Sequence, residues 1–381
     1  MYDMLLKNAE ILNRDFQWER SDLAVQDGRI AAIGTDLGEA AETLDLSGRR
    51  IVPGFVDIHI HGCAGSDACD ATPDALAAMA GYLITKGVTS FCPTTMTISH
   101  DGILAALKNV QACMENPPAG AAIRGVNMEG PYIAESRKGA QKAEFVRRPD
   151  WREFTELNDA CGGIVRLVAL APECDGAEEF IRHVKGICTI SLAHTDADYE
   201  TASRSFALGV SHATHLFNAM TGMNHRAPGA VGAVLSHPDV RAEIICDGFH
   251  IHPAVLKIAF QVLGDDRAVI ISDSIRSAGL PDGVSELGGQ TVYVQDGQAR
   301  LADGTIAGST TNLLDEARNL ISYGIPPERV FRSASLNPAK EIGCEKEIGS
   351  IEPGKSADLV VLTPDWDLEL VIARGEKSYQ K

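Results

Sequence analysis

The chain has 381 residues, of which 45% are hydrophobic and 23% are charged, and its formal net charge is −18. This length suits one large α/β barrel with a small appendage, or two to three ordinary domains, and it excludes a disordered chain or a disulfide-stapled miniprotein. The acidic balance leaves no basic stripe. It therefore argues against a nucleic-acid binder and against a protein that binds anionic membranes.

Targeting and redox signals point to a cytoplasmic protein. No stretch approaches 18 uninterrupted apolar residues, so we expect no transmembrane helix. The opening run MYDMLLKNAEILNRD lacks a basic region followed by an apolar core, so it does not predict a signal peptide. The nine cysteines are scattered and form no Cys-x-x-Cys pair, which indicates reduced thiols rather than a zinc ribbon or a redox dithiol.

The two ends of the chain share a β-rich texture. Residues 1–52 contain short apolar runs with turn signals, and Asp27-Gly28 between alternating apolar residues predicts a hairpin. Residues 344–381 contain the similar run IGSIEPGKSADLVVLTPDWDLELVIARGE. We expect these two segments to form one small β domain, which brings the chain ends together.

The middle of the chain, residues 53–343, alternates strand-like and helix-like runs. Eight near-continuous apolar runs predict a parallel (β/α)8 barrel, because strands buried on both faces need not alternate. A doubly wound open sheet is the alternative, but it seldom needs eight such units. Residues 282–302 predict a β-hairpin insertion after the last barrel strand. The predicted strands are FVDIHIH, VTSFCPT, IRGVNMEG, IVRLVALAP, ICTISLAHT, VSHATHLF, AEIICDG and AVIISDS, and helical patterns cover residues 73–86, 101–115, 176–184, 198–208 and 253–263.

Polar side chains follow these strands where catalytic groups of a barrel lie, at the carboxyl ends. Each is ordinary alone, as a solvated carboxylate or a packed histidine, but together they match the ligands of a divalent metal with open positions. In His59-Ile60-His61 both imidazoles point to one face of a strand. Asp273 can take a proton from a metal-activated water, or it can simply cap the following segment. The set is His59, His61, Glu129, His194, His215 and Asp273.

Several motifs resemble the amidohydrolase superfamily and, within it, its sugar-phosphate deacetylases. The resemblance runs from end to end, and EGPY with THLFNAM is its most specific part. It implies a TIM-like (β/α)8 barrel with a small β-sandwich built from both termini, and a homodimer. The motifs are PGFVDIHIHG, MEGPYI, Ala193–Thr195, Thr214–Met220, ISDSIRSAGLPDG and GSIEPGKSADLVVL.

The resemblance also implies a metal centre. Glu129, His194 and His215 match the residues that hold the family's principal metal. His59 and His61 match a pair that holds a second metal in some members and is absent in others, so one or two ions per subunit are expected. Zinc is the first expectation, and iron, manganese or cobalt suit similar ligands.

The implied reaction is hydrolysis of the acetamide of N-acetylglucosamine 6-phosphate to glucosamine 6-phosphate and acetate, in aminosugar recycling. Asp273 matches the residue that first accepts a proton from the attacking water and then protonates the departing amine. Three alternatives stay open: the 4-epimer N-acetylgalactosamine 6-phosphate or another N-acyl sugar phosphate, a cyclic amide hydrolase or deaminase of the same superfamily, and a scaffold that has lost its chemistry.

Further positions match the family's substrate contacts. Arg226 matches an arginine that reaches the phosphate across the dimer interface, although it could be a surface charge, and Asn218 could merely turn the chain. Two positions depart from the family. Gln141 stands where a histidine is usual, which allows a slower reaction or a shifted substrate, and Arg276 either contacts an anion or, as we prefer, points to solvent. The predicted substrate-binding residues are Ala140, Gln141, Asn218, Ala219, Arg226, His250, Ile306, Ala307 and Gly308.

Overall fold

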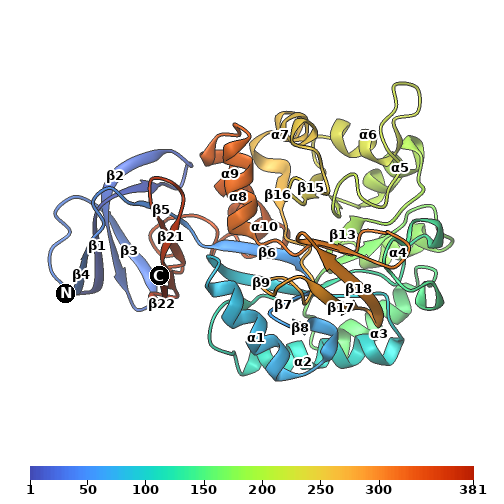
Figure 1. Ribbon diagram of the computed structural model, residues 1–381, viewed down its shortest axis with the longest axis horizontal. Helices are drawn as coiled ribbons and strands as arrows, with labels where there is room; N and C mark the ends of the chain where they lie inside the picture. Colours follow the sequence, from blue (N-terminus) through green and yellow to red (C-terminus); the bar gives the residue numbers. More distant parts are fainter.

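Strands from both ends of the chain form one eight-stranded sheet with a sandwich-like shape. The computed structural model describes residues 1–381. In this sheet the C-terminal β20 pairs antiparallel with the N-terminal β5, and both termini lie in this part of the molecule (Figure 1). The strands are β1 (Tyr2–Leu12), β2 (Trp18–Gln26), β3 (Arg29–Gly34), β4 (Ala40–Asp45), β5 (Arg50–Pro53), β20 (Leu359–Leu362), β21 (Leu368–Ala373) and β22 (Glu376–Gln380).

The predicted hairpin at Asp27-Gly28 is confirmed. β2 and β3 pair antiparallel on either side of it. Asp27 and Gly28 have φ of 51° and 73°, as a two-residue turn that matches the strand twist requires. The apolar side chains of this sheet, among them Leu6, Ile51 and Leu359, form a buried cluster of their own.

Eight parallel strands form the predicted barrel. β6 and β16 close it through the chain that follows β16, because Asp273 N donates to His59 O at 2.9 Å and His61 N donates to Ser274 O at 2.9 Å. Every residue of β6 and β9 is buried, as expected for barrel strands that are covered on both faces. The strands are β6 (Phe55–Ile60), β9 (Val88–Thr95), β11 (Val126–Met128), β12 (Val165–Leu170), β13 (Thr189–Leu192), β14 (His212–Ala213), β15 (Arg241–Ile244) and β16 (Ala268–Ile270); short β7 (Gly62–Cys63), β8 (Ser66–Asp67) and β10 (Ala122–Ile123) accompany them.

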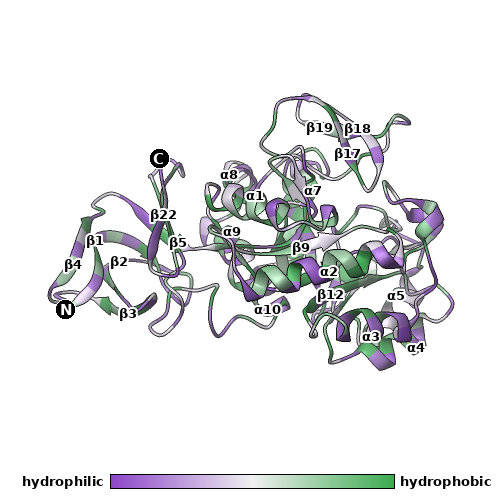
Figure 2. Ribbon diagram, turned by 90° about the horizontal axis from the view of Figure 1, so that it is seen from below, coloured by the Kyte–Doolittle hydropathy of each residue, from purple (hydrophilic) through white to green (hydrophobic).

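Helices surround the barrel, with hydrophobic and hydrophilic residues interleaved along α2 and α3 (Figure 2). Side-chain caps start several of them, for example Thr72 before α1 and Asp198 before α5. The five helical patterns of the sequence correspond to α1, α2, α4, α5 and α7. No helix is both long and apolar enough to cross a membrane. The helices are α1 (Pro73–Ile84), α2 (His100–Glu115), α3 (Trp151–Asp159), α4 (Ala177–Val184), α5 (Tyr199–Leu208), α6 (Gly229–Ser236), α7 (Pro253–Arg267), α8 (Leu313–Ser322), α9 (Pro327–Ala334) and α10 (Leu336–Glu341).

The insertion after the last barrel strand is a three-stranded antiparallel sheet, one strand more than the predicted hairpin. It consists of β17 (Gly283–Leu287), β18 (Gln290–Gln295) and β19 (Gln298–Arg300). Figure 2 shows it standing over the barrel beside α7. Its inner side chains, including Leu287 and Val292, cluster with Met96 and Ile275 of the barrel loops. The insertion therefore covers one side of the barrel opening.

Candidate active site

A single pocket collects most of the predicted site residues. Eighteen residues line it. They come from loops that follow the barrel strands, as expected for the carboxyl end of a barrel, from Leu287 at the end of β17, and from the segment after the β17–β19 insertion. The predicted residues among them are His61, Glu129, Ala140, Gln141, His194, His215, Asn218, Ala219, His250, Asp273, Ile306 and Gly308.

Three predicted residues lie outside this lining. His59 is fully buried beneath the pocket, next to Glu129 and Asp273. Ala307 is also fully buried. Arg226 is exposed on the loop between β14 and α6 and is not among the lining residues. The expectation that Arg226 reaches the phosphate across a dimer interface belongs to the resemblance.

Three of the strand-end residues have an uncommon backbone conformation. His194, His215 and Asp273 have φ of 44°, 28° and 46°, in the left-handed region that residues with a side chain rarely adopt. Each follows a buried strand that holds it in place. Backbone strain of this kind persists where the surrounding structure enforces it, often at functional sites.

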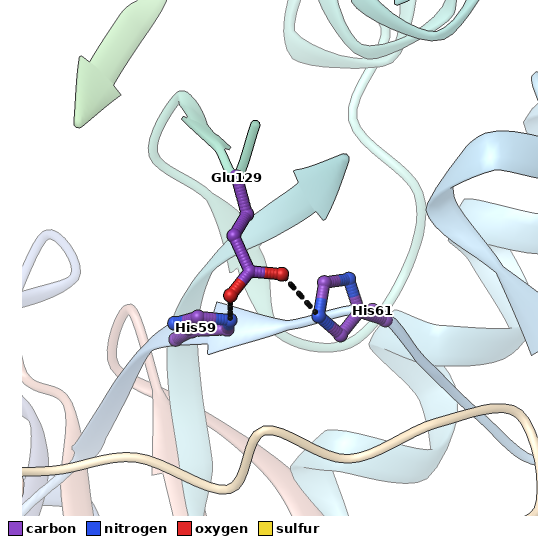
Figure 3. A group of neighbouring side chains, drawn as sticks. All are labelled: His59, His61 and Glu129. Carbon is purple, nitrogen blue, oxygen red and sulfur yellow. Dashed lines mark ion pairs between the residues drawn. The ribbon is translucent and has the colours of Figure 1, made fainter. Parts of the chain in front are cut away.

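Glu129 lies at the centre of the site, directly after β11. Its Oε1 is 2.9 Å from His215 Nε2, 3.2 Å from His194 Nε2 and 3.6 Å from His59 Nε2, and its Oε2 is 3.2 Å from His61 Nε2. Figure 3 shows the carboxylate of Glu129 between the imidazole of His59, in β6, and that of His61, directly after β6. Burial raises the pKa of Glu129, but the surrounding imidazoles outweigh it and hold that pKa well below the usual range. Glu129 is therefore ionised.

Gln141 is held by the protein at both ends of its amide. Its Nε2 donates to Glu129 Oε2 at 2.6 Å, and its Oε1 accepts from the backbone N of Thr97 at 2.7 Å. The side chain is buried although it lines the pocket. Its polar atoms are thus already bonded within the site.

The donor atoms fit a divalent metal. Two groups of three ligand atoms each converge within 4.8 Å, one from His59, His61 and Glu129 and the other from Glu129, His194 and His215. The ring nitrogens Nε2 of His194 and His215 lie 3.2 Å apart, and the buried Nε2 of His59 has no hydrogen-bond partner. Nitrogen atoms that converge on a carboxylate in this way suit zinc and other first-row metals.

Asp273 faces the same cluster from the chain that follows β16, beside the end of β6. Its Oδ1 is 3.3 Å from His61 Nε2 and 3.5 Å from His59 Nε2. Burial raises the pKa of Asp273, but the two imidazoles outweigh it and lower that pKa, so the group is a carboxylate. Its backbone O accepts from Ser309 N at 2.8 Å, which ties it to the segment containing Gly308. An ionised, anchored carboxylate at this place can accept a proton.

Sequence reasoning missed several residues of the pocket. One of them is Arg137, which belongs to none of the sequence motifs. Its guanidinium Nε donates to Asp196 Oδ1 at 2.5 Å. His250 is oriented by Asp247, since its Nδ1 lies 2.7 Å from Asp247 Oδ2. Besides Arg137, the lining residues that were not predicted are Met96, Ser136, Gly139, Leu287 and Thr305.

The prediction that the side chain of Arg276 points to solvent was wrong. Its side chain is only 23% exposed and pairs with Asp70 at 2.8 Å instead of pointing to solvent. It does not line the pocket either. Nearby carboxylates, Asp70 foremost, outweigh burial and raise the pKa of Arg276. The side chain is therefore a partner of the loop before α1.

Known proteins resemble this chain along its whole length. Residues 50–377 match the Amidohydrolase family. The N-acetylglucosamine-6-phosphate deacetylase of Bacillus subtilis (strain 168) is 37% identical over 99% of this chain and 97% of its own. The N-acetylgalactosamine-6-phosphate deacetylase of Escherichia coli O157:H7 is 35% identical over 98% of both chains.

Solved structures agree. A mutant N-acetyl-D-glucosamine-6-phosphate deacetylase of Mycobacterium smegmatis, in complex with N-acetyl-D-glucosamine-6-phosphate, has a TM-score of 0.93 at 30% identity and covers 100% of both chains. The Pasteurella multocida N-acetylglucosamine-6-phosphate deacetylase also has a TM-score of 0.93 at 30% identity, covering 99% of this chain and 100% of its own. This chain belongs to the amidohydrolase family and, within it, groups with the N-acetylglucosamine-6-phosphate deacetylases.

Proposed function

We propose that this chain is a metal-dependent hydrolase that converts N-acetylglucosamine 6-phosphate to glucosamine 6-phosphate and acetate, in aminosugar recycling. The observation that carries the proposal is the meeting of Asp273 with the Glu129, His194 and His215 cluster in one pocket. Deacetylase relatives that align over nearly the whole chain support the choice of substrate.

In this proposal Glu129, His194 and His215 hold the principal metal, and His59 and His61 provide for a second. Zinc is the first choice, and iron, manganese and cobalt fit the same donors. When bound, the metal supplies a Lewis acid that polarises the acetamide carbonyl and lowers the pKa of a water.

Asp273 performs the proton transfers. Its ionised carboxylate accepts a proton from the attacking water as the tetrahedral centre forms at the acetyl carbon. It then returns that proton to the nitrogen as the carbon–nitrogen bond breaks, because an amine leaves poorly as an anion. The carboxylate lies beside the cluster, because its Oδ1 is 3.3 Å from His61 Nε2.

The remaining pocket residues bind the sugar phosphate. His250, Asn218, Ala219, Ile306 and Gly308, which all line the pocket, contact this part of the substrate. Ala140 and Gln141 border the acetamide end, and Ala307 supports the backbone of its neighbours. Arg226 reaches the phosphate from a second subunit, so the working unit is a homodimer. We further propose that this homodimer is cytoplasmic.

The epimer N-acetylgalactosamine 6-phosphate is a second candidate substrate. The Escherichia coli relative named for it is 35% identical to this chain. Gln141 adds a specific reason, since the resemblance implies a histidine there that binds the substrate. The engaged amide of Gln141 changes that contact.

Acetate release tests the proposal. The protein is stripped with a chelator, reloaded with zinc, manganese, iron or cobalt, and given both hexosamine phosphates and unphosphorylated N-acetylglucosamine. We expect metal-dependent turnover of N-acetylglucosamine 6-phosphate, slower turnover of its epimer and little of the free sugar. Turnover of none of the three by metal-loaded protein would contradict the proposal.

A further inference from the structure

A line of buried ionisable side chains runs from the site through the barrel interior. Glu243 of β15 and His212 of β14 are both 0% exposed, and Glu341 of α10 is also buried. Charged groups in a barrel core are costly, and apolar side chains of similar size would usually pack there at least as stably. Their presence calls for a role other than core packing.

The line is continuous from the site to the half-exposed side chain of Arg241. His59 Nδ1 lies 2.8 Å from Glu243 Oε2. Glu243 Oε1 is 3.2 Å from His212 Nε2, and His212 Nδ1 is 2.7 Å from Glu341 Oε2, both at ion-pair distance without hydrogen-bond angles. Arg241 Nη1 donates to Glu341 Oε1 at 2.5 Å.

One oxygen of Glu243 contacts both groups of candidate metal ligands. Besides facing the ring of His59, Oε2 accepts from the backbone N of His215 at 3.2 Å. His215 is one of the residues with a left-handed backbone, and this bond restrains it there. Because His59 belongs to one ligand group and His215 to the other, Glu243 is placed to orient both.

We propose that Glu243 is a positioning residue for the metal centre, held in place by His212, Glu341 and Arg241. Its Oε2 accepts a hydrogen bond from Nδ1–H of His59, which keeps the ring proton on Nδ1 and leaves the lone pair of Nε2 free to bind a metal, facing Glu129 and Asp273. Such carboxylate–histidine contacts fix the tautomer and orientation of a ligating ring. The proposal rests on the proposed function, since it takes the cluster to be the metal site.

Cobalt binding tests this role separately from turnover. The Glu243→Gln variant keeps the size of the side chain and removes its charge. Full-length apo-protein is titrated with Co²⁺ against a competing chelator, and the visible spectrum is recorded. The matched control is Glu316→Gln: Glu316 is equally buried, and its Oε1 accepts from Cys246 N at 3.0 Å without contacting the ligands.

We expect Glu243→Gln to lower the Co²⁺ affinity by about 10–100-fold, the usual effect of losing such a partner, and to change the spectrum. Glu316→Gln should change neither. Unchanged affinity and spectrum in Glu243→Gln, or an equal loss in the control, would overturn the role. Since no substrate is present, a wrong substrate assignment leaves this result intact.

A distal variant covers the case in which Glu243→Gln does not fold. Glu341→Gln removes the next carboxylate of the line and touches no metal ligand. We expect it to weaken Co²⁺ binding in the same direction by about threefold or more, through His212 and Glu243. An unchanged affinity in Glu341→Gln would overturn the supporting role of the line.

Discussion

The side-chain amide of Gln141 donates a 2.6 Å hydrogen bond to Oε2 of Glu129 and accepts one of 2.7 Å from the backbone N of Thr97. Both of its polar ends are therefore engaged by the protein. In this arrangement Gln141 orients the carboxylate at the centre of the site. It differs from the substrate contact that the resemblance implies for a histidine at this position.

Removing the amide tests that assignment. We expect Gln141→Ala to lower kcat for N-acetylglucosamine 6-phosphate by about 10–100-fold, because the carboxylate of Glu129 loses an orienting partner. KM should change little. Steady-state kinetics with both epimers measures this. A raised KM with an unchanged kcat would instead place Gln141 on the substrate, and the Gln141→His variant shows whether the family residue restores or shifts the preference.

Arg226 is exposed on its own chain, so its predicted role is in a neighbouring subunit. We expect Arg226→Ala to raise KM for the phosphorylated sugar by about 10–100-fold, the usual value of a hydrogen bond to a charged group. Turnover of the unphosphorylated sugar serves as the internal control. Equal effects on both sugars would remove Arg226 from the phosphate site.

Mixed dimers test whether Arg226 acts across the interface. Arg226→Ala chains and Asp273→Asn chains are unfolded separately, mixed, and then refolded together. If Arg226 serves its partner, mixed dimers contain one complete site and regain activity that neither variant has alone. If Arg226 serves its own chain, no mixed site is complete and the activity of the mixture stays at the average of the two variants.

The backbone conformation and close neighbours of Gly308 predict that a side chain added there lowers the stability of the fold. Its φ is +60°, and a Cβ there would lie 2.7 Å from Ile275 Cγ2 and 2.9 Å from Asp273 O. We expect Gly308→Ala to destabilise the fold by about 1–3 kcal/mol and to lower activity by displacing Asp273. Gly304→Ala is the control, since its φ is +89° and no atom lies within 4 Å of its added Cβ. Equal activity losses in both variants would refute the close-approach argument.

The buried contacts of His212 with Glu243 and Glu341 predict that the stability of the fold depends on pH. Burial lowers the pKa of His212, but the carboxylates of Glu341 and Glu243 outweigh it and raise the pKa to about 9. A pKa above the unfolded value of about 6.5 means that this stabilisation is complete below pH 6.5 and is lost as the pH rises through about 9. Denaturant unfolding between pH 6 and pH 10 measures it.

The control for this pH dependence is a second histidine. His212→Gln should flatten the decline in the free energy of unfolding at alkaline pH. His183→Gln, which removes an exposed ring stacked on Trp151, should keep the decline of the parent. An identical decline in all three proteins would show that His212 does not carry it.

The strand order and the site cluster follow from the sequence because both depend on local pattern. Apolar runs such as FVDIHIH are buried on both faces, and in a parallel barrel their carboxyl ends meet at one opening. That is why Glu129 and Asp273, 144 positions apart in the printed sequence, could be placed together. The resemblance then added roles that pattern alone left open.

The missed features depend on contacts between distant segments. Glu243 lies inside the apolar run AEIICDG, and Glu341 lies in a short helix near the C-terminal end of the barrel, so no spacing connects them with His59. Arg137 reaches the pocket from a short turn after β11, and Leu287 from the end of β17, and no motif encodes either position. Arg276 pairs with Asp70 across about 200 residues of sequence, as its contact shows.

The most direct measurement is acetate release by Asp273→Asn beside the parent, with bound metal and thermal unfolding recorded for both. Asparagine keeps the size of the side chain but cannot accept and return a proton. We predict a loss of about 10²–10⁴-fold in kcat, with metal content and unfolding temperature unchanged. Turnover near the parental rate in the metal-loaded variant would contradict the assignment of Asp273 as the proton-transfer group.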